Sequence, residues 1–110
     1  MIFQQGDIVF LDFNPSEGHE PKNKRPAVVV SSTRVNYMTN LVLLAPVIST
    51  DNKFPLHVPI ALGNVITGFV QCEALRALDL RSRRGVEHVG ELDDDTLSAI
   101  LEAVGVVVGI

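Results

Sequence analysis

The chain has 110 residues, 46% of them hydrophobic, and a formal net charge of −4, a composition that excludes a disordered chain and predicts one domain, residues 1–110. No apolar stretch approaches the roughly 20 residues that cross a membrane, and the first residues lack a signal-peptide pattern, so we expect a cytoplasmic protein with no membrane partner. Cys72 is the only cysteine and His19, His57 and His88 are widely spaced, which excludes an internal disulfide and indicates no metal site.

Five β-strands are predicted from short apolar runs bounded by Gly, Pro and polar residues, at 8–13, 27–31, 41–48, 56–60 and 67–72. The loop 14–24 between the first two strands has eleven residues, which is long for a hairpin, and such loops are often functional. Pro26 lies just before the second strand, a position that suits a residue without an amide donor. Pro46 indicates an edge or a bulge near the end of the third strand, and Pro59 indicates an edge in the fourth.

The segments between and after these strands give further expectations. Residues 32–40 form a polar connection with room for a short helical turn, and residues 74–78 either extend the sheet or form a short crossing strand. Near the C-terminus, apolar residues recur at helical spacing, namely Leu97, Ile100, Leu101, Val104 and Val108. Asp93 suits the N-cap of this helix, whereas Gly105 and residues 106–108 weaken its last turns. The predicted fold class is mainly β with a C-terminal helix: a small, strongly bent antiparallel sheet on which the helix packs.

The charge is unevenly distributed along the chain. Residues 85–110 carry six acidic side chains and no Lys or Arg, whereas residues 1–84 carry nine basic and seven acidic side chains, so that nine minus seven gives +2. The net charge argues weakly against a nucleic-acid ligand, but the local field of the basic body matters more to a ligand than the total. A nucleic-acid ligand is therefore compatible with the sequence.

Four motifs follow one another in the first third of the chain: G-D-I-V at 6–9, D-F-N-P at 12–15, G-H-E at 18–20 and R-P-A-V-V-V at 25–30. Together with LVLLAPVIST, FPLHVPI and GFVQCEALRALDL further along, their order resembles that of MazF/PemK-type toxins, which are endoribonucleases of type II toxin–antitoxin systems. The resemblance covers nearly the whole chain. It implies an SH3-like barrel of the CcdB/MazF/PemK type.

The same resemblance implies an activity and partners. Members of this family cleave single-stranded RNA, mRNA included, at short sequences without a metal or another cofactor, and they leave a 2′,3′-cyclic phosphate and a 5′-hydroxyl. They are homodimers, and a cognate MazE-like antitoxin is expected to cover the basic groove with an acidic and apolar C-terminal segment. Contact with DNA is expected only indirectly, through that antitoxin.

Metal-free RNA cleavage needs a base for the 2′-hydroxyl proton, an acid for the leaving oxygen and positive charge for the phosphorane. Arg25 is the first candidate, because it stands where the loop meets a buried strand and its guanidinium binds phosphate through two hydrogen bonds. On spacing alone it could instead pair with Glu20 or Asp12 at the surface. His19 and Glu20 match the G-H-E motif, and either could exchange protons; the alternative is a solvated pair in the loop.

Glu73 follows the fifth predicted strand, where relatives resembling PemK carry an aspartate proposed as the general base. Those relatives place an arginine two positions earlier, whereas this chain has Gln71. The departure removes one candidate acid, leaves Arg25 as acid or phosphorane stabiliser, and makes Arg76 a candidate phosphate contact. Alternatively, Glu73 is a surface carboxylate paired with Arg76.

The segment P-V-I-S-T at 46–50 departs from the family pattern. The family places a phosphate-binding threonine where this chain has Ile48, and an isoleucine side chain cannot donate a hydrogen bond. Ser49 or Thr50 could supply the hydroxyl if a bulge shifts the register, so both are candidate catalytic residues.

Further candidate RNA contacts carry a basic, polar or aromatic side chain: Asn14, Lys24, Gln71, Phe54, Arg81, Arg83 and Arg84. Phe54 could stack on a splayed base or pack under Pro55. The three arginines could bind phosphates away from the cut, or form a solvated turn, or contact the acidic tail. His57, His88 and Cys72 are expected to be structural.

Two other functions are compatible with this fold. One is a non-enzymatic, gyrase-binding toxin like CcdB. CcdB-like chains end in Trp-Gly-Ile, whereas this chain ends in Val108, Gly109 and Ile110 and has no Trp, so it lacks that aromatic anchor. The other is a catalytically impaired barrel that only binds its antitoxin, as Ile48 and Gln71 would indicate.

Overall fold

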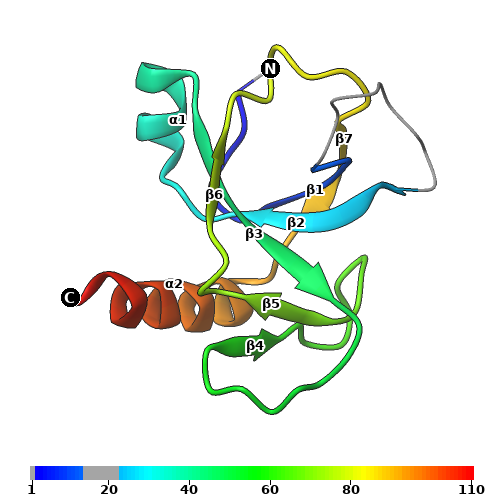
Figure 1. Ribbon diagram of the computed structural model, residues 1–110, viewed down its shortest axis with the longest axis vertical. Helices are drawn as coiled ribbons and strands as arrows, with labels where there is room; N and C mark the ends of the chain where they lie inside the picture. Colours follow the sequence, from blue (N-terminus) through cyan, green and yellow to red (C-terminus); the bar gives the residue numbers. More distant parts are fainter. Residues whose placement is uncertain (1, 14–22) are drawn as a thin grey trace.

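The computed structural model of this protein describes residues 2–13 and 23–110. Figure 1 shows a bent antiparallel sheet with the helices α1 and α2 beside it. In chain order the elements are β1 (Asp7–Leu11), β2 (Arg25–Val29), α1 (Thr33–Thr39), β3 (Val42–Ile48), β4 (His57–Pro59), β5 (Phe69–Gln71), β6 (Arg76–Leu78), β7 (Glu87–Glu91) and α2 (Asp94–Val108). In the described ranges, neither helix is long and apolar enough to cross a membrane.

β3 is the central strand of the sheet. The described strands are ordered β4-β5-β3-β2-β1-β7, β6 pairs with β3 outside this path, and the pairs are antiparallel. β3 pairs with β6 over residues 42–44 and with β5 at Val47 and Ile48. Pro46, which has no amide donor, lies where β3 changes from one neighbour to the other. Beyond this point β4 and β5 turn away from the other strands and lie beside α2 (Figure 1).

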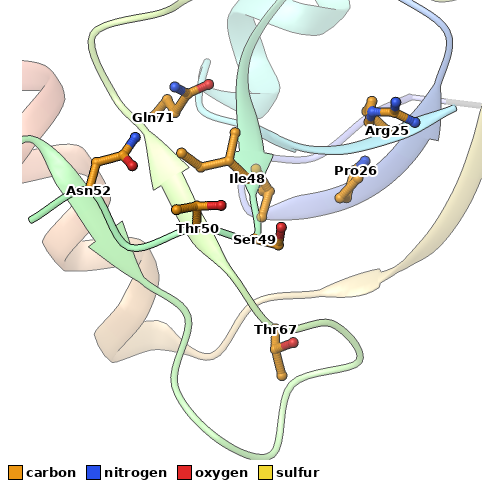
Figure 2. Close-up of a pocket in the computed structure, with 9 residues that line it drawn as sticks. Arg25, Pro26, Ile48, Ser49, Thr50, Asn52, Thr67 and Gln71 are labelled. Carbon is orange, nitrogen blue, oxygen red and sulfur yellow. The ribbon is translucent and has the colours of Figure 1, made fainter. Parts of the chain in front are cut away.

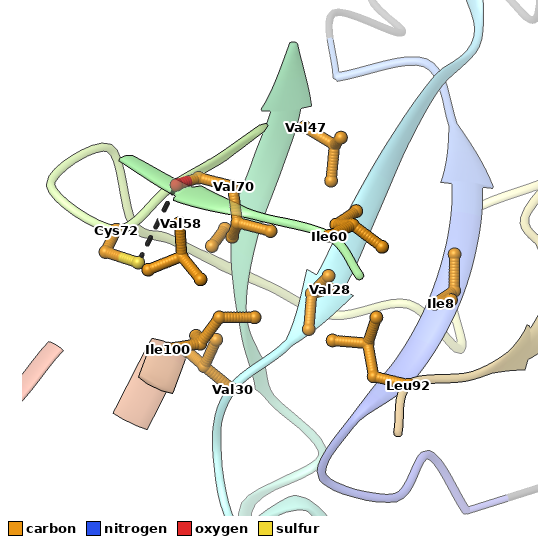
Figure 3. Close-up of a cluster of buried hydrophobic side chains, with 11 residues drawn as sticks. Ile8, Val28, Val30, Val47, Val58, Ile60, Val70, Cys72, Leu92 and Ile100 are labelled. Atoms are coloured by element: carbon orange, nitrogen blue, oxygen red, sulfur yellow. Dashed lines mark hydrogen bonds between the residues drawn. The ribbon is translucent and has the colours of Figure 1, made fainter. Parts of the chain in front are cut away.

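The core lies on both faces of β1, β2 and β3. Alternate side chains of these strands enter two separate hydrophobic clusters, so that Ile8 and Val28 belong to one cluster, and Val9 and Val29 to the other. Figure 3 shows the first cluster, which Ile100 of α2 joins from the helix side. Because both faces are buried, these strands read as continuous apolar runs rather than as an alternation of apolar and polar residues.

The five predicted strands are all present, and the predicted mainly β fold with a C-terminal helix is confirmed. β1 and β2 begin one and two residues earlier than predicted, and the other three strands are shorter than predicted. Residues 76–78 form the strand β6. It lies in the segment 74–78, for which the sequence predicts either an extension of the sheet or a short crossing strand. Pro59 lies in an edge strand, as predicted. Pro46 marks neither an edge nor a bulge, because it is paired with Ala27 and the pairs of β3 with β2 and β5 follow in regular register.

β7 is not among the predicted strands. Its sequence E-H-V-G-E is polar, and its side chains are exposed or half-buried because it lies at the edge of the sheet beside β1. α1 is a helix of seven residues where the sequence predicts only a short helical turn. The Oγ of Ser32 accepts the N–H of Val35 at its start, and Asn40 closes it in the left-handed conformation.

α2 begins at the predicted N-cap, where the carboxylate of Asp93 accepts the N–H of Thr96 at 3.1 Å. The predicted weakening by Gly105 and residues 106–108 does not shorten the helix, which continues to Val108. Gly109 adopts the left-handed conformation, and the N–H groups of residues 109 and 110 donate to the carbonyls of residues 106 and 105 at 3.2 and 2.8 Å. These bonds satisfy the last carbonyls of the helix.

Candidate active site

An open pocket of about 610 Å³ lies between the start of β2, the end of β3 and β5. Its volume falls in the usual range for ligand sites, roughly 300–1,000 Å³. The described residues that line it are Arg25, Pro26, Val47, Ile48, Ser49, Thr50, Asn52, Thr67 and Gln71 (Figure 2). Four of them are candidates predicted from the sequence, namely Arg25, Ser49, Thr50 and Gln71. The fold brings these four together from three separate segments of the chain.

Arg25 is held at the wall of the pocket by the strand that it begins. It pairs with Leu11 of β1, and Pro26 and Ala27 lead from it into the buried part of β2. The residue itself is exposed, and its Nη1 donates a hydrogen bond to the carbonyl of Lys24 at 3.1 Å. A rigid strand thus carries a charged side chain that a phosphate can reach.

Ser49 and Thr50 directly follow β3. Ile48, the last residue of this strand, pairs with Phe69 of β5 in regular register, so no bulge brings a hydroxyl to the position of Ile48. The two hydroxyl residues line the pocket because the chain continues along its wall after β3 ends. In Figure 2, Ser49 lies on the Arg25 side of Ile48, and Thr50 lies on the side of Asn52.

Sequence reasoning missed two residues that line the pocket, Asn52 and Thr67. Asn52 belongs to a polar turn whose composition does not indicate what it faces. Thr67 precedes Gly68, which has a φ of +137°, and a Cβ at Gly68 would lie 2.7 Å from the carbonyl oxygen of Ile48. This glycine allows β5 to approach β3, and it is the one feature of the sequence that could have marked this wall of the pocket.

Glu73 does not line the pocket. Its Oε2 lies 2.8 Å from Nε2 of His57, whose side chain is 5% exposed, and this pair replaces the alternative pairing with Arg76. The guanidinium of Arg76 instead lies 5.3 Å from the centre of the Phe13 ring, a cation–π contact outside the pocket. Cys72 is fully buried, as expected; its burial and the neighbouring Glu73 carboxylate raise the pKa of the thiol to about 11.

Two of the predicted RNA contacts are engaged in contacts elsewhere. Lys24 pairs with Glu87 of β7, the strand that the sequence did not predict. Arg83 donates from Nη1 to the carbonyl of Asp12 at 3.0 Å, so its observed contact is with the end of the first strand and not with the acidic tail. Neither basic residue lines the pocket.

The remaining candidates also lie outside the pocket lining. Phe54 is 45% exposed, and its ring meets the ring of His57 edge to face, with 5.2 Å between the centroids. Arg81 borders a small cavity next to Asn40, at the end of α1. Arg84 is exposed. These positions are compatible with contacts to a long ligand, but the pocket does not include them.

Three candidates, Asn14, His19 and Glu20, lie outside the described residues. Within residues 2–13 and 23–110, no three His, Cys, Asp or Glu side chains come together in a group that could hold a metal ion. The pocket therefore offers a guanidinium, two hydroxyl-bearing residues from one segment, a further threonine and two carboxamides. Such a set can bind an anion at one end and a neutral polar group at the other.

The amino-acid sequence is similar to that of a known protein family and of several of its members. Residues 4–108 match the family described as PemK-like, MazF-like toxin of type II toxin-antitoxin system. The endoribonuclease toxin MazF of Escherichia coli (strain K12) is 28% identical over 104 residues, which cover 94% of this chain and 92% of that protein. The endoribonuclease PemK of Escherichia coli is 31% identical over 95 residues, which cover 80% of this chain and 71% of that protein.

A solved structure agrees with these sequence matches. A chain of the MazE-MazF crystal structure (Form-III) from Deinococcus radiodurans superposes with a TM-score of 0.85 and 31% sequence identity, covering 100% of this chain and 99% of the other. The superposition extends over the sheet and α2 alike. It confirms the SH3-like barrel that the sequence resemblance implies.

Proposed function

The chain belongs to the family of PemK-like, MazF-like toxins of type II toxin–antitoxin systems, and from this premise we propose that it cuts single-stranded RNA at a short sequence without a metal. It is an endoribonuclease, the activity for which its curated relatives are named. The observation that carries the proposal is the pocket in which Arg25 faces the segment of Ser49 and Thr50. We further propose that residues 1–110 form a single toxin domain.

The proposed reaction is an internal phosphoryl transfer. The 2′-oxygen attacks the adjacent phosphorus and loses its proton to a base, while the bond from phosphorus to the 5′-oxygen breaks and that oxygen gains a proton. The products are a 2′,3′-cyclic phosphate and a 5′-hydroxyl. Arg25 can hold two oxygens of the phosphorane through its guanidinium, or donate the proton to the leaving oxygen, and a hydroxyl of Ser49 or Thr50 can donate to a phosphate oxygen.

The base has three candidates. His19 and Glu20 precede Arg25 in the sequence, and either group can accept a proton near neutral pH. Glu73 is the third candidate, and its contact with His57 at 2.8 Å favours a structural role. We therefore propose His19 or Glu20 as the base.

We propose two protein partners. The first is a second copy of this chain, for which the apolar side chains exposed on α2 and after it, Val106, Val108 and Ile110, offer contact area. The second is a MazE-like antitoxin with an acidic and apolar segment, since the similar chain from Deinococcus radiodurans was crystallised as a MazE-MazF structure. Such a segment would cover Arg25 and exclude RNA from the pocket. DNA would be contacted only through the antitoxin.

The test is cleavage of a long defined RNA in the presence of EDTA, with the cuts mapped by primer extension. The wild type is compared with Arg25→Ala and with Arg34→Ala, an exposed arginine on α1 outside the pocket. We expect discrete cuts from the wild type and from Arg34→Ala, and a loss of at least about a hundredfold in rate for Arg25→Ala. The new 5′ ends should accept a phosphate label directly, as free hydroxyls do.

Two results would contradict the proposal. Loss of all cuts on addition of EDTA, with recovery by a divalent metal, would exclude the metal-free reaction. Intact RNA from a folded wild type, while a MazF relative cuts the same RNA, would favour one of the other two functions: a gyrase-binding toxin like CcdB, or a barrel that only binds its antitoxin.

A further inference from the structure

One wall of the pocket carries two carboxamides. In Figure 2, Asn52 and Gln71 lie on one side of Ile48, and Arg25 lies on the other. Within residues 2–13 and 23–110, neither side-chain amide makes a hydrogen bond to another part of the chain. Both amides therefore keep a donor and an acceptor available to a ligand.

We propose that this wall, formed by Ile48, Asn52 and Gln71 and here called the amide wall, binds the nucleobase next to the phosphate held by Arg25 and sets the sequence preference of cleavage. The inference rests on the proposed ribonuclease function, because it takes Arg25 as the phosphate contact. It gives the departures from the family pattern at Ile48 and Gln71 a role in choosing the RNA sequence.

The chemistry of the wall fits a base better than a second phosphate. Arg25 is the one charged residue among the described residues that line the pocket, so the amide wall is neutral. A carboxamide presents a donor and an acceptor side by side, and it pairs with a base edge that presents the complementary groups, as adenine does. Unpaired RNA bases expose such edges. The aliphatic side chain of Ile48 can contact the face of the ring.

Gln71 is attached to a fixed part of the backbone. It ends β5, where its partner across the ladder is His57 of β4, and its carbonyl accepts the N–H of Ala74 at 3.1 Å. His57 is itself held by Glu73 at 2.8 Å. Because this frame fixes the backbone of Gln71, binding a base orders only the side chain, and this favours discrimination between bases.

Asn52 is also placed by local structure. The carboxylate of Asp51 accepts the N–H of Lys53 at 2.8 Å, which closes a tight turn around Asn52. Lys53 adopts a φ of 55°, a conformation uncommon for residues other than glycine. The turn leads the chain from Ser49 and Thr50 to β4, and Asn52 lies among the residues that line the pocket.

The first experiment measures the cleavage sequence. A random-sequence RNA pool is cut by the wild type, by Gln71→Leu, by Asn52→Leu and by the control Gln4→Leu, in which an exposed glutamine outside the pocket is changed. In each amide variant we expect the preference for one base at one position beside the cut to fall about tenfold. Gln4→Leu should keep the sequence preference of the wild type. An unchanged profile in both amide variants would overturn the proposal.

A second experiment is independent of cleavage. Short 2′-O-methyl oligonucleotides, which lack the attacking hydroxyl, are identical except for one base and are titrated into the wild type. The NMR signals of the Asn52 and Gln71 side-chain amides are followed. Shifts that depend on the base support the amide wall, and shifts that are absent or equal for all four bases overturn it. If the wild type leaves RNA intact, the ribonuclease proposal fails, and this titration still decides whether the wall binds a base.

Discussion

The imidazole Nε2 of His57 lies 2.8 Å from the carboxylate Oε2 of Glu73, and this contact joins β4 to the segment that follows β5. Nδ1 of the same ring is buried without a hydrogen-bond partner in the described part of the chain. The tautomer with its proton on Nε2 satisfies the carboxylate and leaves only an acceptor buried at Nδ1. The pair thus ties β4 to the end of β5, the strand that carries Gln71 in the wall of the pocket.

We expect replacement of His57 by Ala to lower the free energy of unfolding by about 2–3 kcal/mol, because it removes a buried ring and leaves Glu73 without its partner. Glu73→Gln should cost less than about 1 kcal/mol, since the amide oxygen still accepts the imidazole proton. Urea unfolding of the two variants measures both. Glu73→Gln should also cut RNA within about threefold of the wild-type rate, whereas a general base would lose about a hundredfold or more.

Gly68 should tolerate no side chain. A Cβ there would lie 2.7 Å from the Ile48 carbonyl oxygen and 2.8 Å from Cγ1 of Val47, at a φ of +137°. We expect Gly68→Ala to destabilise the protein by about 3 kcal/mol or more and to reduce cleavage, because β5 must move away from β3.

Gly63→Ala is the matched control for this prediction. Gly63 also has a positive φ, +97°, but a Cβ there would meet nothing within 4 Å. The substitution should therefore cost only the backbone strain, about 1–2 kcal/mol, and leave cleavage intact. Equal losses of stability for the two variants would show that the close approach of β5 to β3 adds nothing to the cost of Gly68→Ala.

The cap of α2 predicts a dependence of stability on pH. Hydrogen bonds from Thr96 and Asn64 lower the pKa of Asp93 from 3.8 to about 2. Because the folded state holds this carboxyl ionised, its contribution is complete above about pH 3.8 and is lost as the pH falls through about 2. The melting temperature of the wild type should exceed that of Asp93→Ala by a nearly constant amount at higher pH, and the difference should shrink over this window. If the difference in melting temperature persisted below about pH 2, the stabilisation by Asp93 would come from contacts that do not need the ionised carboxylate.

The strands around the core were predictable because buried positions are occupied by apolar residues, which can be recognised in the sequence. Val28 and Val29 face opposite clusters, and each strand with two buried faces appears as an apolar run. The composition of β7 gives no such indication, because an edge strand with exposed side chains is held by backbone hydrogen bonds that any residue except proline can make. The Lys24 pair with Glu87 depends on that strand and could not be predicted without it.

The pocket was predictable only in part, for a related reason. Arg25 and the hydroxyl pair lie in segments with recognisable motifs, and the fold brings these segments together. Asn52 and Thr67 enter the pocket through a turn and through the close approach at Gly68, neither of which a residue pattern specifies. The partner of Glu73 was also unexpected, since His57 is sixteen positions away and becomes a neighbour only when β4 pairs with β5.

Cys72 should be chemically inert in the folded protein. It is fully buried, and burial together with the Glu73 carboxylate raises the pKa of its thiol to about 11, so that little thiolate forms near neutral pH. We expect iodoacetamide to leave the native protein unmodified and to add one adduct in denaturant, as mass spectrometry would detect. Rapid alkylation of the native protein would mean that β5 opens readily.

The pocket draws on segments that are far apart in the order of synthesis. Its wall is incomplete until Gln71 has been made, and β4, which flanks that wall through its pairing with β5, packs against α2, the last element of the fold. A growing chain on the ribosome therefore carries Arg25 long before it has a site in which to use it. For a toxin, this order of assembly would delay activity until nearly the whole chain has emerged, which gives an antitoxin made at the same place time to bind first.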